Sequence, residues 1–296
     1  MIAAVRSICM LAAAWFAACA IAAPLAALRD ADGRPAQLGT PATRIVTTAP
    51  SLAELVFAAG AGDKLVGVSA YSDFPQQARS LPIIGDSAGI SVESLLSLTP
   101  DLVLTWKGGT RESDVQRIQT LHIPVFAIDV VELSDVPKAL RAIGQLIGKT
   151  ETAELAAVRF ESRIDALRAA HRGKAAVATF FEISATPLMT INRHHFIAET
   201  IRLCGGVNVF DGESTMVFTP SREALLSKGA DLVLTAGTGD GARTADRYRG
   251  LAAARRGLIL PLTADYILRP GPRLLYAVDE VCAAIDRARS QMANVN

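Results

Sequence analysis

The sequence predicts an α/β protein of two similar lobes with mainly parallel sheets, joined by one long backbone helix. The first observation behind this prediction is an internal duplication. Residues 91–105 read SVESLLSLTPDLVLT, residues 221–235 read SREALLSKGADLVLT, and ten of the fifteen positions are identical. The offset of 130 residues (221 − 91) is far too long for a solenoid repeat. It indicates a chain made of two similar halves.

Each copy of the duplicated stretch predicts a helix. Ser91 and Ser221 are good N-cap residues, because a hydroxyl can accept a hydrogen bond from a free amide of the first turn. Glu93 and Glu223 fall in that first turn, at the positive end of the helix dipole. The predicted buried side of the two helices consists of Leu95, Leu96, Leu225 and Leu226.

The second observation is the apolar run Asp-Leu-Val-Leu-Thr that ends both copies. Such a run is typical of a strand buried on both faces of a parallel sheet. A helix, a break and a buried strand, found twice, predict two α/β lobes. Taken alone, each glutamate is explained by the helix dipole. The duplication adds that one acid stands at the equivalent point of each lobe.

The third observation is a long amphipathic segment between the halves. Within residues 151–172, apolar residues recur at helical spacing from Ala157 to Leu167. Thr150 is predicted to cap this helix and Gly173 to end it. A stiff helix in this place, instead of a Gly/Ser linker, implies lobes held at a nearly fixed separation.

The chain is predicted to divide into five parts. In order they are a signal peptide (1–23), an N-terminal arm (24–43), an N-terminal lobe (44–148), the linking helix (149–173) and a C-terminal lobe (174–291).

The amino terminus has the pattern of an export signal. Arg6 supplies its positive charge, residues 8–21 are small and apolar, and Ala20-Ile21-Ala22 fits a cleavage site, so we expect a periplasmic protein. An alternative is lipoprotein processing at Cys19, which would add a lipid anchor. Cleavage removes Arg6 from the 30 basic residues and leaves 29 against 29 acidic residues. This balance argues against a nucleic-acid partner.

Strands and helices are predicted to alternate through the N-terminal lobe. The predicted strands are 44–48, 65–68, 101–105 and 125–128, and the helices besides the duplicated one are 51–59, 112–121 and 136–147. Ser51 and Glu54 have the spacing of a capping box for the first of these helices. Gly60 is its predicted stop.

The C-terminal lobe repeats this plan. Besides the duplicated stretch, it is predicted to contain a strand at 175–183, a helix at 192–204, a strand at 258–262 and a long helix from Pro272. Residues 237–250 match no phosphate-binding pattern and are predicted to form a surface loop.

Two cysteines remain after signal cleavage, Cys204 and Cys282. An even number in an exported protein favours a disulfide, and both residues fall on apolar helix faces. Two buried free thiols are the alternative at this point.

The sequence contains no Gly-x-Ser-x-Gly elbow, Walker loop or dinucleotide fingerprint. His194 and His195 are the only histidine cluster, and adjacent helical residues point about 100° apart, so they cannot chelate one metal from a regular helix. One of them could still be an axial ligand to a metal held by another group.

Two lobes, a rigid joining helix, an export signal and no recognised catalytic motif favour a binding protein, with its ligand at the carboxyl ends of the strands between the lobes. A periplasmic hydrolase that uses Asp73 or Asp265 is the weaker alternative.

Several motifs together resemble a known family. They are Tyr71-Ser72-Asp73-Phe74-Pro75, Pro100-Asp101-Leu102-Val103 with Trp106-x-Gly108-Gly109, Leu203-Cys204-Gly205-Gly206-x-Asn208-x-Phe210, Ser221-Arg222-Glu223, and Arg269-Pro270-x-Pro272-Arg273. The chain resembles the substrate-binding proteins of ABC importers for vitamin B12, haem and iron-siderophores, and the vitamin-B12-binding members look closest. The resemblance implies the class III periplasmic binding protein fold.

The resemblance also implies roles for individual residues. Glu93 and Glu223 match glutamates that pair with arginines of the membrane permease. Cys204 and Cys282 match the two cysteines of the family disulfide. The implied ligand contacts are Tyr71, Trp106, Arg269, Asp265 and Ser51. Flat aromatic faces would pack on a macrocycle, and an arginine would meet amide or phosphate oxygens.

The implied ligand is therefore cobalamin, a transported macrocycle and not a resident cofactor. The implied partners are the permease and ATPase of an ABC importer, and the protein is expected to act as a monomer. Some aromatics expected around a corrin are replaced, by Ser87, Met189 and Val217. Haem or a ferric siderophore is the alternative ligand, with His194 or His195 available to an iron.

Overall fold

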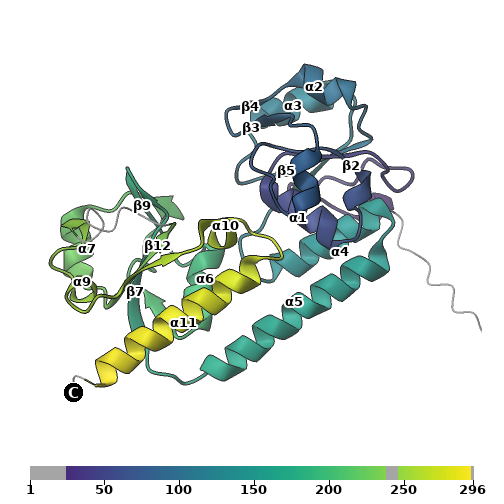
Figure 1. Ribbon diagram of the computed structural model, residues 1–296. Coiled ribbons are helices and arrows are strands. Elements are labelled where there is room, and N and C mark those ends of the chain that lie inside the picture. The colour runs from purple at the N-terminus through teal and green to yellow at the C-terminus, as the bar shows by residue number, and fades with distance from the viewer. Residues whose placement is uncertain (1–24, 238–245, 295–296) are drawn as a thin grey trace, which may run out of the picture.

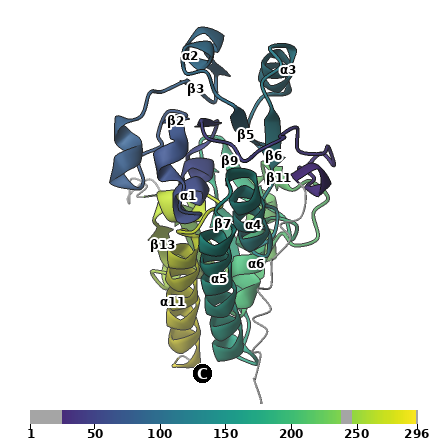
Figure 2. The same cartoon turned by 90° about the vertical axis from the view of Figure 1, so that its right-hand side faces the viewer.

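The computed structural model describes residues 25–237 and 246–294, and it confirms the predicted fold class. Two α/β lobes are joined by helix α5 (Thr150–His171), and α11 (Leu274–Ala293) lies beside α5 (Figure 1, Figure 2). The predicted signal segment with Cys19, and part of the 237–250 loop, fall outside the described residues. Within the described ranges, no helix is both long and apolar enough to span a bilayer.

The N-terminal lobe is built on a four-stranded parallel sheet. Its strands, in spatial order, are β2 (Leu65–Gly67), β1 (Ile45–Thr47), β5 (Leu102–Trp106) and β6 (Val125–Ile128). The other elements of the lobe are α1 (Pro50–Ala58), η2 (Gly62–Lys64), η3 (Gln76–Ser80), β3 (Gly85–Asp86), β4 (Gly89–Ile90), α2 (Val92–Ser97), α3 (Glu112–Thr120) and α4 (Asp135–Ile147). The arm before the lobe holds η1 (Leu25–Ala27) and an antiparallel bridge between Arg29 and Pro35.

The C-terminal lobe has a second four-stranded parallel sheet. Its strands, in spatial order, are β10 (Gly206–Asn208), β7 (Val177–Glu182), β12 (Leu232–Ala236) and β13 (Ile259–Leu262). Its helices, besides α11, are α6 (Phe196–Leu203), α7 (Arg222–Lys228), α9 (Ala252–Arg255) and α10 (Ala264–Ile267). A small antiparallel sheet is formed by β8 (Ser184–Ala185), β9 (Leu188–Ile191) and β11 (Val217–Phe218).

The two parallel sheets have one topology. When the strands of each sheet are counted in chain order, the second lies beside the first, and the third and fourth follow on the other side of the first. The duplicated stretches become α2 with β5 and α7 with β12. Both predicted N-caps are confirmed, because Ser91 Oγ accepts from the Ser94 amide at 3.2 Å and Ser221 Oγ accepts from the Ala224 amide at 3.1 Å.

One prediction about the duplicated helices is wrong. Leu95 and Leu225 are buried as expected, but Leu96 is 46% exposed and Leu226 is 40% exposed. Neighbouring helical residues point about 100° apart, so only one leucine of each adjacent pair can face the sheet.

Two predicted helix starts are also wrong. Helix α1 begins at Pro50, with Ala49 as its N-cap, so Ser51 lies inside the first turn and the predicted capping box does not form. Proline is well suited to a first helical position, because the amide that it lacks would have no helical partner there. Thr150 is the first residue of α5 instead of its cap. The helix predicted within residues 192–204 is confirmed as α6, which has His195 as its N-cap.

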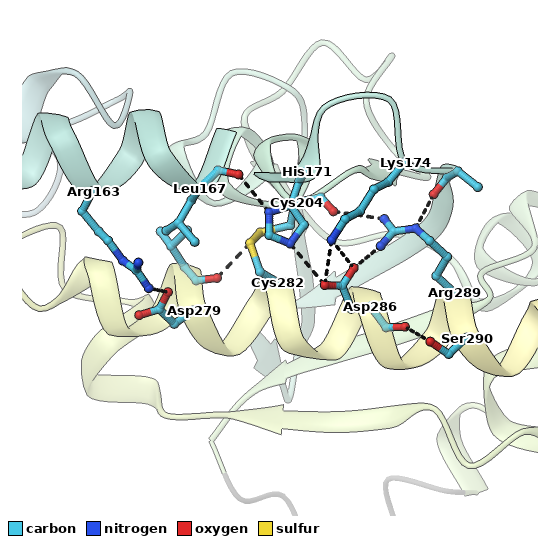
Figure 3. Close-up of polar contacts among 12 residues, drawn as sticks. Arg163, Leu167, His171, Lys174, Cys204, Asp279, Cys282, Asp286, Arg289 and Ser290 are labelled. Atoms are coloured by element: carbon cyan, nitrogen blue, oxygen red, sulfur yellow. Dashed lines mark hydrogen bonds and ion pairs between the residues drawn. A yellow bond between two sulfur atoms is a disulfide. The ribbon is translucent and has the colours of Figure 1, made fainter. Parts of the chain in front are cut away.

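Helix α11 is attached to the rest of the molecule through a disulfide and an ion-pair cluster. The disulfide joins Cys204 to Cys282, as predicted, and Figure 3 shows it beside the charged cluster. Asp286 of α11 accepts from Lys174 Nζ at 3.0 Å and lies 3.2 Å from His171 Nε2. These contacts connect α11 to the end of α5, so the two long helices form one backbone for the molecule.

The disulfide is expected to contribute strongly to stability. Replacement of Cys204 and Cys282 by alanine should lower the free energy of unfolding by about 4 kcal/mol, because the bond closes a loop with a sequence separation of 78 residues. Urea unfolding of the two proteins measures the difference. Reductant should destabilise the parent protein and leave the variant unchanged. Equal unfolding midpoints for parent and variant would show that the bond does not stabilise the fold.

Candidate ligand cleft

A hollow lies at the carboxyl ends of the N-terminal sheet, where ligands of open parallel sheets bind. Its volume is about 140 Å³. The residues that line it include Thr48, Pro50, Ser69, Tyr71, Trp106 and Arg111. Pockets that enclose a drug-sized molecule measure roughly 300–1,000 Å³. A large ligand would therefore place only one part of itself in this hollow and extend toward the other lobe.

Trp106 is the last residue of β5, and two glycines allow the chain to fold back against its ring. A Cβ atom at Gly109 would stand 2.4 Å from the ring carbons, and one at Gly108 would stand 3.0 Å away. Thr110 Oγ1 accepts from the Trp106 amide at 3.0 Å and holds the turn. The Trp-x-Gly-Gly motif thus packs the loop tightly against the indole ring.

Tyr71 stands out from the same rim. Its side chain is 78% exposed, and its φ of 65° lies in the left-handed region, which is uncommon for a residue other than glycine. Such conformations concentrate at ligand sites. Tyr71 and Trp106 both line the hollow, so the structure brings these two predicted contacts together.

The C-terminal lobe contributes Arg269 to the same region. Its Nη1 donates to Asp73 Oδ1 of the N-terminal lobe at 2.6 Å, and its Nη2 lies 2.8 Å from Asp265 Oδ1. Burial alone would raise the pKa of Asp73, but the hydrogen bond and charge of Arg269 outweigh it and lower the pKa. Two predicted contacts, Arg269 and Asp265, are therefore held together by an ion pair. Arg269 also binds Asp73, for which the sequence suggests a role only in the hydrolase alternative.

Sequence reasoning missed a buried contact between the lobes. Glu54 of α1 accepts two hydrogen bonds from Arg273, from Nε at 2.9 Å and from Nη2 at 2.6 Å. Glu54 was interpreted as half of a capping box, although an acid inside the apolar run Leu52–Ala59 is itself a signal of a buried partner. Burial raises the pKa of Glu54 despite the opposing effect of Arg273.

Ser51 lies beside this contact. It is only 4% exposed, and a Cβ atom at Gly271 of the other lobe would stand 3.5 Å from its carbonyl oxygen.

Arg111 is a second residue that sequence reasoning missed. It lines the hollow, and its Nε donates to Asp114 Oδ2 at 3.0 Å. Arg111 directly follows the Trp-x-Gly-Gly-Thr turn, and this position in the sequence could have identified it as a residue of the hollow.

Glu93 and Glu223 lie away from the hollow, in the exposed first turns of α2 and α7. Figure 1 shows α2 at the outer end of the N-terminal lobe and α7 at the outer side of the C-terminal lobe. Hydrogen bonds from its own backbone amide and from Ser221 lower the pKa of Glu223. The equivalent placement of the two acids follows from the shared topology of the lobes.

His194 and His195 line a different hollow, with Val131, Glu132 and Arg193. His195 caps α6, and its Nδ1 lies 3.2 Å from the Ile197 amide, which donates to it. Burial lowers the pKa of His195 to about 4, so the ring is neutral at pH 7. Across residues 25–237 and 246–294, no group of three or more His, Cys, Asp or Glu side chains could hold a metal ion.

Comparison with known proteins gives a consistent result. The family model for periplasmic binding proteins matches residues 45–256. The chain is 31% identical over 253 residues to a vitamin B12-binding protein of Vibrio cholerae, covering 85% of this chain and 92% of that protein. It is 32% identical over 244 residues to a vitamin B12-binding protein of Yersinia pestis, covering 81% and 85%.

Solved structures show the same similarity. The periplasmic vitamin B12 binding protein BtuF of Vibrio cholerae matches with a TM-score of 0.76 and 31% identity, covering 84% of this chain and 98% of that one. The periplasmic heme-binding protein RhuT from Roseiflexus sp. RS-1, in its apo form, matches with a TM-score of 0.72 and 25% identity, covering 83% and 98%.

The low pKa of His195 predicts a pH dependence of stability. Between about pH 4 and pH 6.5 the unfolded chain binds a proton at this position that the folded chain does not, so stability should fall as the pH is lowered through this window. His195→Asn keeps an N-cap acceptor and removes the titration. The melting temperature of the variant should change less between pH 6.5 and pH 4 than that of the parent. Equal slopes would contradict the assigned pKa.

Proposed function

The chain belongs to the periplasmic binding protein family, and on that premise we propose that it captures cobalamin in the cleft between its two lobes. The arrangement at the N-terminal rim carries the proposal. Trp106 lies against its Gly-Gly turn, and the exposed Tyr71 lines the same hollow. Arg269, from the other lobe, binds Asp73 in the loop that contains Tyr71. Aromatic faces suit a flat corrin, and a guanidinium suits amide and phosphate oxygens at its rim. The vitamin B12-binding relatives support this choice of ligand.

Haem or a ferric siderophore is the second candidate, because heme-binding proteins share the fold. The placement of the histidines counts against haem. His195 is engaged as the cap of α6, and both histidines line a hollow other than the one that holds Trp106. The hydrolase alternative has little support, since Asp73 and Asp265 are both engaged with Arg269.

We further propose that the protein is exported to the periplasm as a monomer and delivers its ligand to the permease and ATPase of an ABC importer. Glu93 and Glu223 are the proposed docking points, one on each lobe. Their exposure and equivalence support this role. The signal peptide at 1–23, the alternative lipid anchor at Cys19 and the five-part division of the chain stay predictions.

The ligand is tested by calorimetry with cobalamin and with haem. Cobalamin should bind, and Trp106→Ala should weaken that binding by roughly 1–3 kcal/mol, because the ring loses a large buried face. Leu155→Ala is a suitable control, since Leu155 is 56% exposed on α5, away from the hollow. Tight haem binding without cobalamin binding would transfer the assignment to haem.

The docking role is tested with the double variant Glu93→Ala, Glu223→Ala. Both acids are exposed in first turns, where they favour only their helix dipoles, so melting and cobalamin affinity should stay near normal. Uptake into vesicles that contain the importer should fall severely, because charge-assisted pairs with permease arginines fix the orientation of docking.

The matched control for this test is Glu112→Ala with Glu151→Ala. Glu112 and Glu151 are also exposed acids of first turns, in α3 and α5. This control should transport normally. Normal uptake by the Glu93 and Glu223 variant would remove the docking role.

A further inference from the structure

The two lobes touch through a buried, two-pronged ion pair. Glu54 belongs to α1 of the N-terminal lobe, and Arg273 directly precedes α11 of the C-terminal lobe. The residues are 3% and 9% exposed, and both oxygens of Glu54 accept from the guanidinium. A carboxylate and a guanidinium joined in this way share a plane, so the bond specifies an angle between the lobes as well as a distance.

The guanidinium of Arg273 is also covered by aromatic rings. Its central carbon lies 4.3 Å from the centroid of the Phe74 ring and 5.4 Å from that of Tyr266. Phe74 comes from the N-terminal lobe and Tyr266 from α10 of the C-terminal lobe. The cation is therefore enclosed by both lobes, which lowers the local dielectric and strengthens its attraction to Glu54.

The same contact continues into the ligand cleft. Asp73, next to Phe74 in the chain, accepts from Arg269 at 2.6 Å. Arg269 Nη1 also lies 3.8 Å from Glu54 Oε1. The position of Arg269 thus depends on two groups that Arg273 contacts. One is the Asp73–Phe74 loop, and the other is the carboxylate of Glu54.

We propose that Glu54 and Arg273 are positioning residues that fix the angle between the lobes and thereby hold Arg269 in place for the ligand. This inference rests on the proposed function, because Arg269 is a ligand contact only there. The two residues act through Arg269 and the Asp73–Phe74 loop, and need not touch the ligand.

A purely stabilising role makes a different prediction. A buried pair can often be replaced by apolar residues without loss of stability, so burial alone does not explain why this pair is ionic. If the pair served stability alone, its loss would lower the melting temperature and leave both the lobe angle and the contribution of Arg269 unchanged.

The first experiment measures lobe separation without ligand. Ser97 of α2 and Ser227 of α7 are exposed and lie on different lobes. Spin labels attached at Ser97→Cys and Ser227→Cys report the distribution of distances between the two lobes by pulsed electron paramagnetic resonance. Glu54→Gln should broaden or shift this distribution. Asp231→Asn, which breaks the 2.7 Å pair with Arg256 inside the C-terminal lobe, should not.

An unchanged distribution in Glu54→Gln would overturn the proposal. If that variant does not fold, Arg273→Lys gives the same test, because lysine keeps the charge and cannot form the two-pronged bond. This measurement needs no ligand, so its outcome is separate from the question of whether the protein binds cobalamin.

The second experiment measures coupling by calorimetry with cobalamin. Glu54→Gln should raise the dissociation constant about tenfold, within the range that coupled neighbours show. Combined with Arg269→Ala, Glu54→Gln should add little further loss of affinity, because the Glu54–Arg273 pair acts through Arg269. Multiplicative losses in the double variant would refute the positioning role. Absence of cobalamin binding by the parent protein would refute the proposed function instead.

Discussion

The contact on which the rest of this structure depends is the buried ion pair between Glu54 and Arg273. Two lobes joined by one helix have few other means of holding an angle, since α5 sets their separation but not their rotation about its axis. The pair supplies a planar, directional bond between the lobes, next to the Arg269–Asp73 pair and in addition to the hydrogen bond from the Leu133 amide to Glu199. Removing one partner would leave a buried charge without its counterion, which is strongly unfavourable. The proposed angle between the lobes therefore depends on this contact.

The functional surfaces follow from the duplication. Each lobe presents the carboxyl ends of a parallel sheet, and the N-terminal sheet ends in Trp106. The outer turns of α2 and α7 carry one glutamate each, at positions related by the same duplication. A ligand that bridges the lobes and a partner that spans both outer helices would each recognise the same relative placement of the lobes. Under the proposed function, binding and delivery would therefore depend on one geometric constraint.

The sequence predicted what depends on local pattern. The lobes, the linking helix and the caps at Ser91 and Ser221 were all predictable, because periodicity and capping act within a few residues. Contacts between distant segments were not. Glu54 and Arg273 are 219 residues apart, and nothing in either segment specifies the other. The start of α1 was misplaced because Pro50 and Ser51 are both good helix beginnings. Trp106 is the last residue of β5 and Tyr71 lies in the loop after β2, while their contact with a ligand stays a prediction.

Hydrogen exchange of the purified protein, with and without cobalamin, tests the central claim most directly. Amides of a binding surface exchange more slowly when the ligand covers or rigidifies them. The account predicts slower exchange in residues 69–75, 106–111 and 264–273, which come from both lobes and meet at the cleft. Slower exchange confined to residues 131–132 and 193–202, around the histidine hollow, would contradict it. So would protection of one lobe only, because the ligand would then not bridge the cleft.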